Sequence, residues 1–203
     1  NYDFGVAYDG DADRIVAVDE NGGIIRSDIL MALFLPEVIK NPGDYIVFDV
    51  KCSQALEDMI LKYGGNPVMW KTGHSLIKQK MNELGCKLGG EMSGHIFFAD
   101  DYIGFDDAMY AGLRVLSILT RDGLRLDDLR DKLPFMFNTP ELRFVCADES
   151  KVEIVDLVRQ SLKSGGKVDI CEIDGVRVET ESGWWLLRAS NTQPALVARC
   201  ESN

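Results

Sequence analysis

Through the first two thirds of the chain, short apolar runs alternate with segments whose apolar residues recur at helical spacing. Strand-type runs occupy residues 44–50, 66–71, 86–91 and 95–100, and helix-type segments occupy 53–65, 74–85 and 105–123. Strands separated by helices of this length form βαβ crossovers, which make the strands parallel. The pattern predicts an α/β domain, in which helices cover a mixed, mainly parallel sheet in α/β/α layers.

The last third of the chain has a different pattern. Residues 133–140 contain two prolines and are interpreted as a linker, which a strand at 141–147 and a helix at 149–166 follow. Four short strand-type runs complete the chain, at 167–173, 175–180, 184–190 and 195–201. One helix with several strands at turn spacing indicates a small α+β domain with an antiparallel sheet.

The start of the chain contains two more strand-type runs, at 2–9 and 14–22, on either side of an acidic loop. A helix is predicted next, at 27–39. Ser27 is expected to be its N-cap residue, and Pro36 is expected to kink or end it, because proline removes a backbone donor.

Composition narrows the range of functions. The 203 residues are 46% hydrophobic, which is ordinary for a globular protein with a core of its own. The formal net charge of −11 argues against binding duplex nucleic acid, which needs a basic stripe. No run of 18 apolar residues predicts a membrane span, and the first 20 residues lack the features of a signal peptide. We therefore expect a cytoplasmic protein without a nucleic-acid or membrane partner.

The five cysteines form no C-x-x-C pair; they are Cys52, Cys86, Cys146, Cys171 and Cys200. Their odd number and wide spacing indicate reduced thiols, most of them buried as small hydrophobic groups. A cysteine metal site is not expected.

The acidic loop carries carboxylates at Asp9, Asp11 and Asp13, followed directly by Arg14. Three acids at alternate positions repel one another unless a cation neutralises them. A calcium hand fits poorly, because Arg14 occupies its glycine position and the flanks are strand-like. An aspartyl phosphatase would use Asp9 as nucleophile and Asp11 as acid, but leaves the other two residues unexplained. A magnesium site that leaves room for a phosphate oxygen accounts for all three carboxylates.

Two glycine-flanked loops hold the only histidines of the chain. In "GGEMSGH" (89–95), Glu91 and Ser93 can bind a sugar diol and His95 can exchange a proton. In "KTGHS" (71–75), His74 directly precedes a helix, and an N-cap role for Ser75 is the alternative reading. Each loop alone could be an ordinary polar turn.

Two further groups suit an anionic ligand. The stretch "RASNTQP" (188–194) follows an apolar strand and offers a guanidinium fork, hydroxyls and backbone donors that suit a phosphate dianion. Lys51 follows a strand that is predicted to be parallel, where α/β sheets bind ligands. Each has a plain alternative, an Asn-Thr turn and a solvated lysine respectively.

Taken together, "YDGDADR", "KTGHS", "GEMSGH" and "RASNTQP", in this order and at this spacing, resemble the α-D-phosphohexomutase family. The similarity is greatest to its bacterial phosphomannomutase/phosphoglucomutase group, which has a methionine in the third motif. Four motifs across about 190 residues are far more specific than any one of them alone.

The resemblance implies a four-domain enzyme that converts a hexose 1-phosphate into the 6-phosphate through a bisphosphorylated intermediate, with hexose 1,6-bisphosphate as activator. It implies roles for residues of all the motifs: Mg²⁺ ligands Asp9, Asp11 and Asp13; electrostatic or proton-transfer groups Arg14 and Lys51; acid–base or binding groups His74 and His95; sugar contacts Glu91 and Ser93; and phosphate ligands Arg188, Ser190, Asn191 and Thr192. The resemblance does not indicate whether the enzyme prefers the glucose or the mannose substrate.

One element of the family is absent from these residues. The family's phosphoserine lies in a serine-histidine-asparagine-proline loop, and the 203 residues contain no such run. We expect a C-terminal part of the enzyme: residues 1–23 from the second domain with the metal loop, 24–134 as the third domain and 135–203 as the fourth. The missing N-terminal domains are then its partner, and the isolated chain should be inactive. A non-catalytic phosphosugar-binding module and an aspartyl phosphatase stay as alternatives.

The same reasoning makes an expectation for residues 2–8. Without the sheet of a second domain, this strand should lack pairing partners and expose Phe4, Val6 and Tyr8. A mobile acidic loop would then bind magnesium weakly, because magnesium demands near-ideal geometry.

Overall fold

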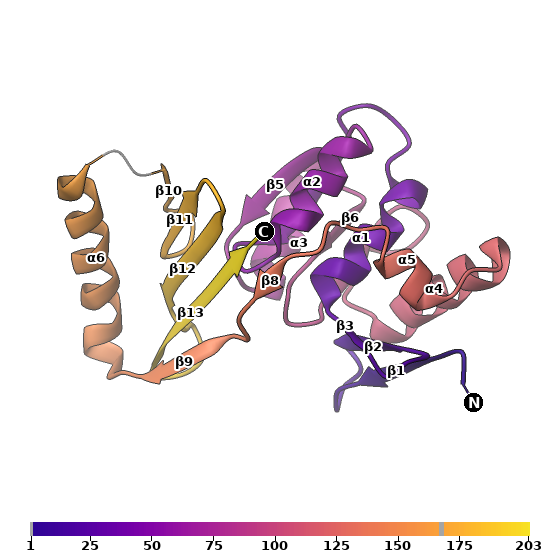
Figure 1. Cartoon of the computed structure of the whole chain (residues 1–203), viewed down its shortest axis with the longest axis horizontal. Helices are drawn as coiled ribbons and strands as arrows, with labels where there is room; N and C mark the ends of the chain where they lie inside the picture. Colours follow the sequence, from indigo (N-terminus) through magenta and orange to yellow (C-terminus); the bar gives the residue numbers. More distant parts are fainter. Residues whose placement is uncertain (1, 167–168) are drawn as a thin grey trace. The chain divides into compact units, whose positions relative to one another are not determined.

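The computed structural model describes residues 2–166 and 169–203, and the chain divides into two compact units (Figure 1). The first unit extends to Phe135, and the second comprises Met136–Asn203. Among the described residues, no helix combines the length and apolar character that crossing a membrane requires.

The first unit is built around a four-stranded sheet in the order β5-β4-β6-β7. These strands are β4 (Tyr45–Asp49), β5 (Asn66–Trp70), β6 (Leu88–Gly90) and β7 (Ile96–Phe98). β4 is parallel to both β5 and β6, and only β7 runs antiparallel, to β6. The predicted mixed, mainly parallel sheet is confirmed.

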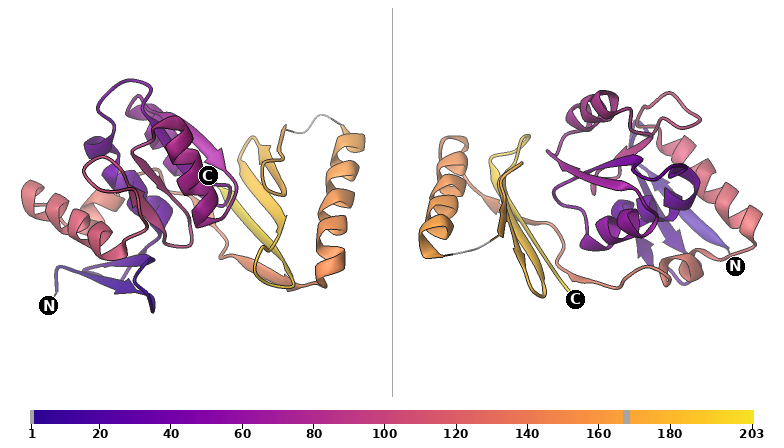
Figure 2. Two further views of the ribbon diagram at one scale, coloured as in Figure 1. Left: turned by 180° about the vertical axis from the view of Figure 1, so that it is seen from behind. Right: turned by 90° about the horizontal axis from the view of Figure 1, so that it is seen from above.

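Helices cover both faces of this sheet (Figure 2). They are α1 (Ser27–Val38), α2 (Gln54–Lys62), α3 (His74–Leu84), α4 (Ala108–Asp122) and α5 (Leu126–Arg130). Ile46 and Phe48 of β4 join the large core formed with α1, α2 and α4, whereas Val47 between them joins Ile77 and Met81 of α3. Because successive strand residues point to opposite faces, one apolar run supplies both cores and the α/β/α layering follows.

A small antiparallel sheet precedes α1; it consists of β1 (Phe4–Tyr8), β2 (Ile15–Asp19) and β3 (Ile24–Ile25). The prediction that residues 2–8 lack a pairing partner is wrong, because β1 pairs with β2 along its whole length. Phe4 packs against the core, whereas Val6 and Tyr8 are exposed as expected. The chain's own hairpin therefore supports the acidic loop, which joins β1 to β2.

The N-cap assignments of two helices also need correction. The N-cap residue of α1 is Arg26 rather than Ser27, whose hydroxyl instead donates to the Glu91 carbonyl oxygen (2.7 Å). The N-cap residue of α3 is Gly73, so Ser75 has no such role. Pro36 is accommodated inside α1, which ends two residues later.

The second unit is the predicted α+β domain, with an antiparallel sheet in the order β10-β11-β12-β13-β8, and β9 also paired to β13. Its elements are β8 (Phe137–Asn138), β9 (Leu142–Val145), α6 (Asp148–Gly165), β10 (Asp169–Cys171), β11 (Val176–Thr180), β12 (Gly183–Ala189) and β13 (Ala195–Ser202). The predicted linker is thus partly a strand, β8. The predicted strand at 167–173 begins outside the described residues, which resume at Asp169.

The helix α6 lies along one face of this sheet (Figures 1 and 2). Val155 of α6 packs on Val176 and Val178 of β11 and on Leu196 of β13. Alternate residues of each strand therefore face the helix, as the two-residue period of strands requires.

Among the described residues, all five cysteines are thiols rather than parts of a disulfide. Cys52 and Cys86 are buried, but Cys146 and Cys171 are partly exposed and Cys200 is exposed, so the expectation that most are buried is wrong. Burial raises the pKa of the Cys86 thiol to about 11. Its sulfur donates to the carbonyl oxygens of Tyr45 and Leu88, each at 2.9 Å.

Candidate functional site

The carboxyl ends of three parallel strands carry predicted site residues. Lys51 follows β4, the "KTGHS" loop follows β5, and Glu91 follows β6. Because the three strands are parallel and adjacent, these ends lie at one edge of the sheet, where open α/β sheets bind ligands. The fold therefore brings together groups that lie 40 residues apart in the sequence.

Asp49, the last residue of β4, connects all three of these loops. Its buried carboxylate lies 3.5 Å from the Lys51 ammonium and accepts the Thr72 hydroxyl at 3.3 Å and the Met92 backbone N–H at 3.4 Å. Lys51 is itself only 6% exposed, so the pair is largely removed from water. Asp49 was not identified from the sequence.

Glu91 makes a second connection. One carboxylate oxygen accepts the Gly73 backbone N–H and the other accepts the Ser93 hydroxyl at 2.8 Å. Glu91 is buried, while Ser93 is exposed. Glu91 thus joins the "KTGHS" and "GEMSGH" loops, and its remaining lone pairs can still meet a sugar hydroxyl.

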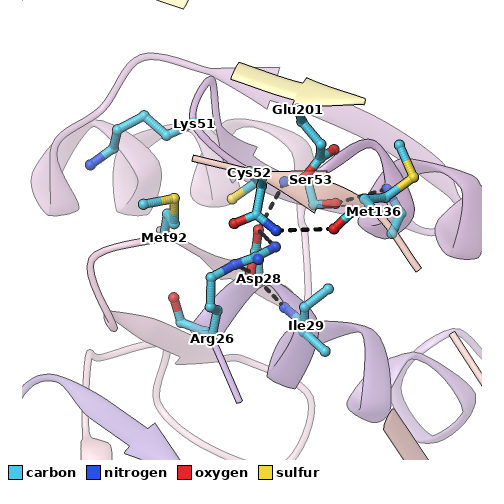
Figure 3. Close-up of polar contacts among 12 residues, drawn as sticks. Arg26, Asp28, Ile29, Lys51, Cys52, Ser53, Met92, Met136 and Glu201 are labelled. Atoms are coloured by element: carbon cyan, nitrogen blue, oxygen red, sulfur yellow. Dashed lines mark hydrogen bonds and ion pairs between the residues drawn. The ribbon is translucent and has the colours of Figure 1, made fainter. Parts of the chain in front are cut away.

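A buried acid behind Lys51 anchors its loop. Asp28, in the first turn of α1, accepts two hydrogen bonds from the Arg26 guanidinium (3.1 and 3.2 Å) and one from the Ser53 backbone N–H at 2.9 Å, as Figure 3 shows. The Ser53 hydroxyl in turn accepts the Ala55 N–H and caps α2. The loop that carries Lys51 is therefore fixed to two helices.

The two histidines lie beside one carboxylate, that of Asp106. His95 Nδ1 lies 3.1 Å and His74 Nδ1 lies 3.3 Å from Asp106 Oδ2, and the Lys78 ammonium donates to Oδ1 at 2.9 Å. The imidazole rings stack with centroids 5.3 Å apart. Burial alone would raise the pKa of Asp106, but the Lys78 hydrogen bond and the neighbouring charges of Lys78 and His95 bring that pKa below its usual value.

The acidic loop turns sharply between β1 and β2, with Ala12 in the left-handed region at φ 57°. The Arg14 Nε donates to Asp9 Oδ2 at 2.5 Å, and the Arg14 backbone N–H donates to Asp9 Oδ1 at 3.2 Å. Burial opposes ionisation of Asp9, but these Arg14 contacts prevail and hold the pKa of Asp9 below its usual value. Arg14 therefore offsets part of the repulsion within the loop.

This loop packs against the "GEMSGH" loop. The Ile15 N–H donates to the Gly94 carbonyl oxygen at 3.1 Å, and His95 Nδ1 lies 3.7 Å from Asp13 Oδ2. Gly94 has φ 113°, and a Cβ there would meet Arg14 Cβ at 3.0 Å. A glycine is needed for this close approach.

The three aspartates fit a hard cation. Carboxylate oxygens of Asp9, Asp11 and Asp13 lie within 4.8 Å of one another. Among the described residues, Asp13 Oδ1 is buried and accepts no hydrogen bond, and its cationic neighbour, Arg14 Nε, lies 3.5 Å away, so this oxygen can still bind a metal ion. The strands on both sides of the loop agree with the sequence argument against a calcium hand.

The predicted phosphate ligands lie in the second unit, at the end of β12 and in the β12–β13 loop. Asn191 and Thr192 are exposed, whereas Arg188 is 4% exposed and donates from Nε to Asp174 Oδ2 at 3.0 Å. The Arg188 Nη2 is buried without a hydrogen bond among the described residues. The guanidinium thus retains an unused donor that suits an anion.

The β12–β13 loop is held by two side chains. The Ser190 hydroxyl oxygen accepts the N–H of Thr192 (3.4 Å) and of Gln193 (3.2 Å). From α6, the Lys151 ammonium donates to the carbonyl oxygens of Ser190 (2.7 Å) and Gln193 (3.2 Å). Ser190 can still donate its own proton, and Lys151 adds a positive charge behind the loop.

The structure therefore assembles Asp9, Asp11, Asp13, Arg14, Lys51, His74, Glu91, Ser93 and His95 in the first unit and Arg188, Ser190, Asn191 and Thr192 in the second. The sequence reasoning missed the groups that hold these residues in place: Asp28, Asp49, Asp106 and Lys151. Asp49 ends a buried strand and Asp106 follows another, which is the only signal that could have identified them.

Comparison with known proteins shows which family has the same two domains. The family model described as phosphoglucomutase/phosphomannomutase, alpha/beta/alpha domain III, matches residues 26–137, and the model of the C-terminal domain matches residues 141–203. A crystal structure of a phosphoglucomutase/phosphomannomutase family protein from Burkholderia thailandensis has a TM-score of 0.89 at 44% identity, over 98% of this chain and 42% of that one.

Comparison with curated proteins gives the same result as the family models. The chain is 46% identical over 204 residues to a phosphomannomutase/phosphoglucomutase of Pseudomonas aeruginosa and 42% identical over 203 residues to a phosphoglucomutase of Neisseria meningitidis. The alignments cover 100% and 99% of this chain but 44% of each relative, so the chain spans less than half of their length. With both domain models matched in order, the chain belongs to the phosphoglucomutase/phosphomannomutase family.

Proposed function

We propose that this chain is the sugar- and phosphate-binding part of a phosphohexomutase, which interconverts a hexose 1-phosphate and the 6-phosphate of glucose, mannose or both. The observation that carries the proposal is the convergence of the three aspartates, the two histidines, Lys51 and Glu91 at one edge of the sheet. The relatives bear the names phosphomannomutase/phosphoglucomutase and phosphoglucomutase, which leaves the sugar preference open.

In this proposal Asp9, Asp11 and Asp13 hold Mg²⁺, which when bound stabilises negative charge on a transferring phosphoryl group. Arg14 and Lys51 add positive charge beside it. Glu91 and Ser93 accept and donate hydrogen bonds to sugar hydroxyls. His74 and His95 supply imidazole nitrogens that can bind a hydroxyl or exchange its proton.

The β12–β13 loop binds the phosphate that does not react. Arg188 offers its unused Nη2, Ser190 its hydroxyl proton, and the exposed Asn191 and Thr192 their polar side chains. A bisphosphorylated intermediate has to turn end for end so that each phosphate reacts in turn. A separate phosphate loop, with sugar contacts that serve both orientations, meets that requirement.

The proposal assigns the phosphoryl donor to a phosphoserine outside these 203 residues, which contain no serine-histidine-asparagine-proline run. Its partners are therefore the remaining domains of the same enzyme and the phosphosugar. Hexose 1,6-bisphosphate is the proposed activator, because it would phosphorylate that serine.

The test incubates the full-length protein that contains this chain with glucose 1-phosphate or mannose 1-phosphate, Mg²⁺ and glucose 1,6-bisphosphate. Accumulation of the 6-phosphate is expected, and an Asp11→Asn variant should be strongly impaired while Asp101→Asn, an exposed acid elsewhere in the first unit, should not. Release of inorganic phosphate without isomer would indicate the aspartyl phosphatase instead. Binding without turnover would indicate a phosphosugar-binding module.

The 203-residue chain alone provides a matched experiment. It should bind glucose 1-phosphate by calorimetry but form no 6-phosphate, even with the bisphosphate. Steady isomerisation by the purified chain would contradict the assignment of the donor to another domain.

A further inference from the structure

Among the described residues, the Asp106 carboxylate lies within 3.3 Å of both histidine rings, and no role was assigned to it from the sequence. It lies between β7 and α4, in a segment whose backbone is constrained on both sides. Phe97 of β7 forms an isolated antiparallel bridge with Asp106, and the next residue, Asp107, caps α4 by accepting the Tyr110 N–H at 2.9 Å. The carboxylate therefore has a well-defined position.

Each of its oxygens has a separate set of neighbours. Oδ1 accepts the hydrogen bond of Lys78. Oδ2 lies within 3.3 Å of Nδ1 of both imidazole rings, although among the described residues the buried Nδ1 of His95 has no aligned hydrogen-bond partner, so the carboxylate acts on the rings through its charge. For His95, Asp106 is closer than the second acid, Asp13, whose oxygen is 3.7 Å away. The ring of His95 is also stacked with that of Phe97, with centroids 6.3 Å apart and planes within 7°.

We propose that Asp106 is a positioning residue, which holds His74 and His95 together as Nδ1–H tautomers so that both present Nε2 to the ligand. A neutral imidazole has one donor and one acceptor nitrogen, and a charge beside one nitrogen biases which of the two carries the proton. A carboxylate beside Nδ1 favours the proton there, because two acceptors would repel.

The arrangement has a chemical consequence. The two stacked rings share one carboxylate at Nδ1, so Nε2 of each ring lies on the side away from Asp106. While the rings are neutral, both Nε2 atoms are hydrogen-bond acceptors. Such nitrogens can accept protons from sugar hydroxyls but cannot donate until protonated. Lys78 compensates the charge of Asp106, so the pair of histidines need not be cationic to stay in place.

The inference rests on the proposed function for what the histidines do, but its test does not. The 203-residue chain contains only two histidines, so ¹⁵N-histidine NMR gives two ring systems, which His74→Gln and His95→Gln variants assign. In the neutral rings of the wild-type chain, we expect the Nδ1–H form to dominate at both positions. Dominance of the Nε2–H form in either neutral ring would overturn the proposal without any variant.

The Asp106→Asn variant should lower the ratio of Nδ1–H to Nε2–H by about tenfold or more at both rings, because it removes a negative charge that lies 3.1 Å from Nδ1 of His95 and 3.3 Å from Nδ1 of His74. Asp101→Asn is the matched control, since it removes one exposed acid of the same segment and should leave both ratios unchanged. Unchanged tautomers in folded Asp106→Asn protein would also overturn the proposal.

A second measurement addresses function in the full-length protein. Asp106→Asn should lower kcat by about 10- to 100-fold, the effect of losing the partner that orients a functional histidine. KM should change less. An unaltered kcat would refute the positioning role. Absence of mutase activity in the wild-type protein would instead refute the proposed function, and the NMR result would stand on its own.

Discussion

In the first unit, buried carboxylates join several loops to one another, whereas in the second unit one lysine and one serine hydroxyl shape a single loop. Asp49 contacts groups that follow three different strands, and Glu91 joins two of the same loops. The Lys151 ammonium and the Ser190 hydroxyl bind backbone groups between residues 190 and 193, and Lys151 also pairs with Asp148 at 2.6 Å within α6.

The two units differ in this way because they position different numbers of separate segments. The first unit must bring together side chains from separate strands, many of them cationic or acidic, so charges serve as the connections. The second unit must only present one short stretch of backbone and Arg188. A substitution should therefore act at a distance in the first unit and locally in the second.

Replacing Asp49 gives the largest expected effect. Asp49→Ala leaves Lys51 buried without its carboxylate, and breaking a buried ion pair in this way costs about 3–5 kcal/mol. Urea unfolding followed by circular dichroism measures the loss, with the exposed Asp101→Asn as control. A loss below about 1 kcal/mol would show that Asp49 does not connect the loops, because a single surface position costs no more.

Arg188→Ala tests whether the second unit binds phosphate at the β12–β13 loop. We expect phosphate or sugar-phosphate binding to weaken by about 1.5–3 kcal/mol, the contribution of a charge-assisted hydrogen bond. Calorimetry on the 203-residue chain measures it. Arg143→Ala is the matched control, because Arg143 is half-exposed and its Nη1 contacts only the side chain of Gln193 in this loop. Equal affinities for wild type and Arg188→Ala would remove Arg188 from the phosphate site.

Lys151→Met tests whether a substitution in the second unit has only local effects. It keeps the aliphatic stem but leaves the carbonyl oxygens of Ser190 and Gln193 without their charged donor, at a cost of about 1.5 kcal/mol. Amide chemical shifts should change around residues 190–194 and α6. Shift changes spread through the first unit would contradict the local character of this loop.

The smallest effect concerns Cys86 at alkaline pH. Its pKa is raised from 9.0 to about 11 by burial, so its contribution to stability is complete below pH 9 and is lost as the pH rises through 11. Between pH 8 and pH 10 the wild-type chain should lose about 1 kcal/mol more stability than Cys86→Ala does. Parallel urea titrations at both pH values provide the comparison, and equal losses would show that Cys86 titrates normally.

Local pattern sufficed for most of the architecture. The continuous apolar run in β4 predicts a buried strand, and the structure places Ile46 and Val47 in different cores on its two faces. The order of strands and helices predicts the parallel sheet, because a βαβ unit has few alternatives. Helix caps were less predictable: Ser27 has the right chemistry for an N-cap, but its hydroxyl donates to the Glu91 carbonyl oxygen instead.

The candidate ligands were likewise readable from the sequence, because each motif gathers unusual residue types within a few positions. The error about residues 2–8 has a simple physical reason. The strand does not depend on a partner from another domain, because β2 begins seven residues further on and pairs with β1 as a hairpin.

The sequence by itself thus determined the order of the elements, the two fold classes and the motifs with their chemistry, since these depend on neighbours in the chain. Only the tertiary structure decided which acids hold the site together. Asp49 and Asp106 are two of 33 acidic residues, and their places after buried strands are the only local sign that distinguishes them. The contacts by which they join separate loops span 23 residues to Thr72 and 43 residues to Met92 for Asp49, and 28 residues to Lys78 for Asp106. Contacts over such separations form only when the sheet brings its strand ends to one edge, so no local pattern can encode them.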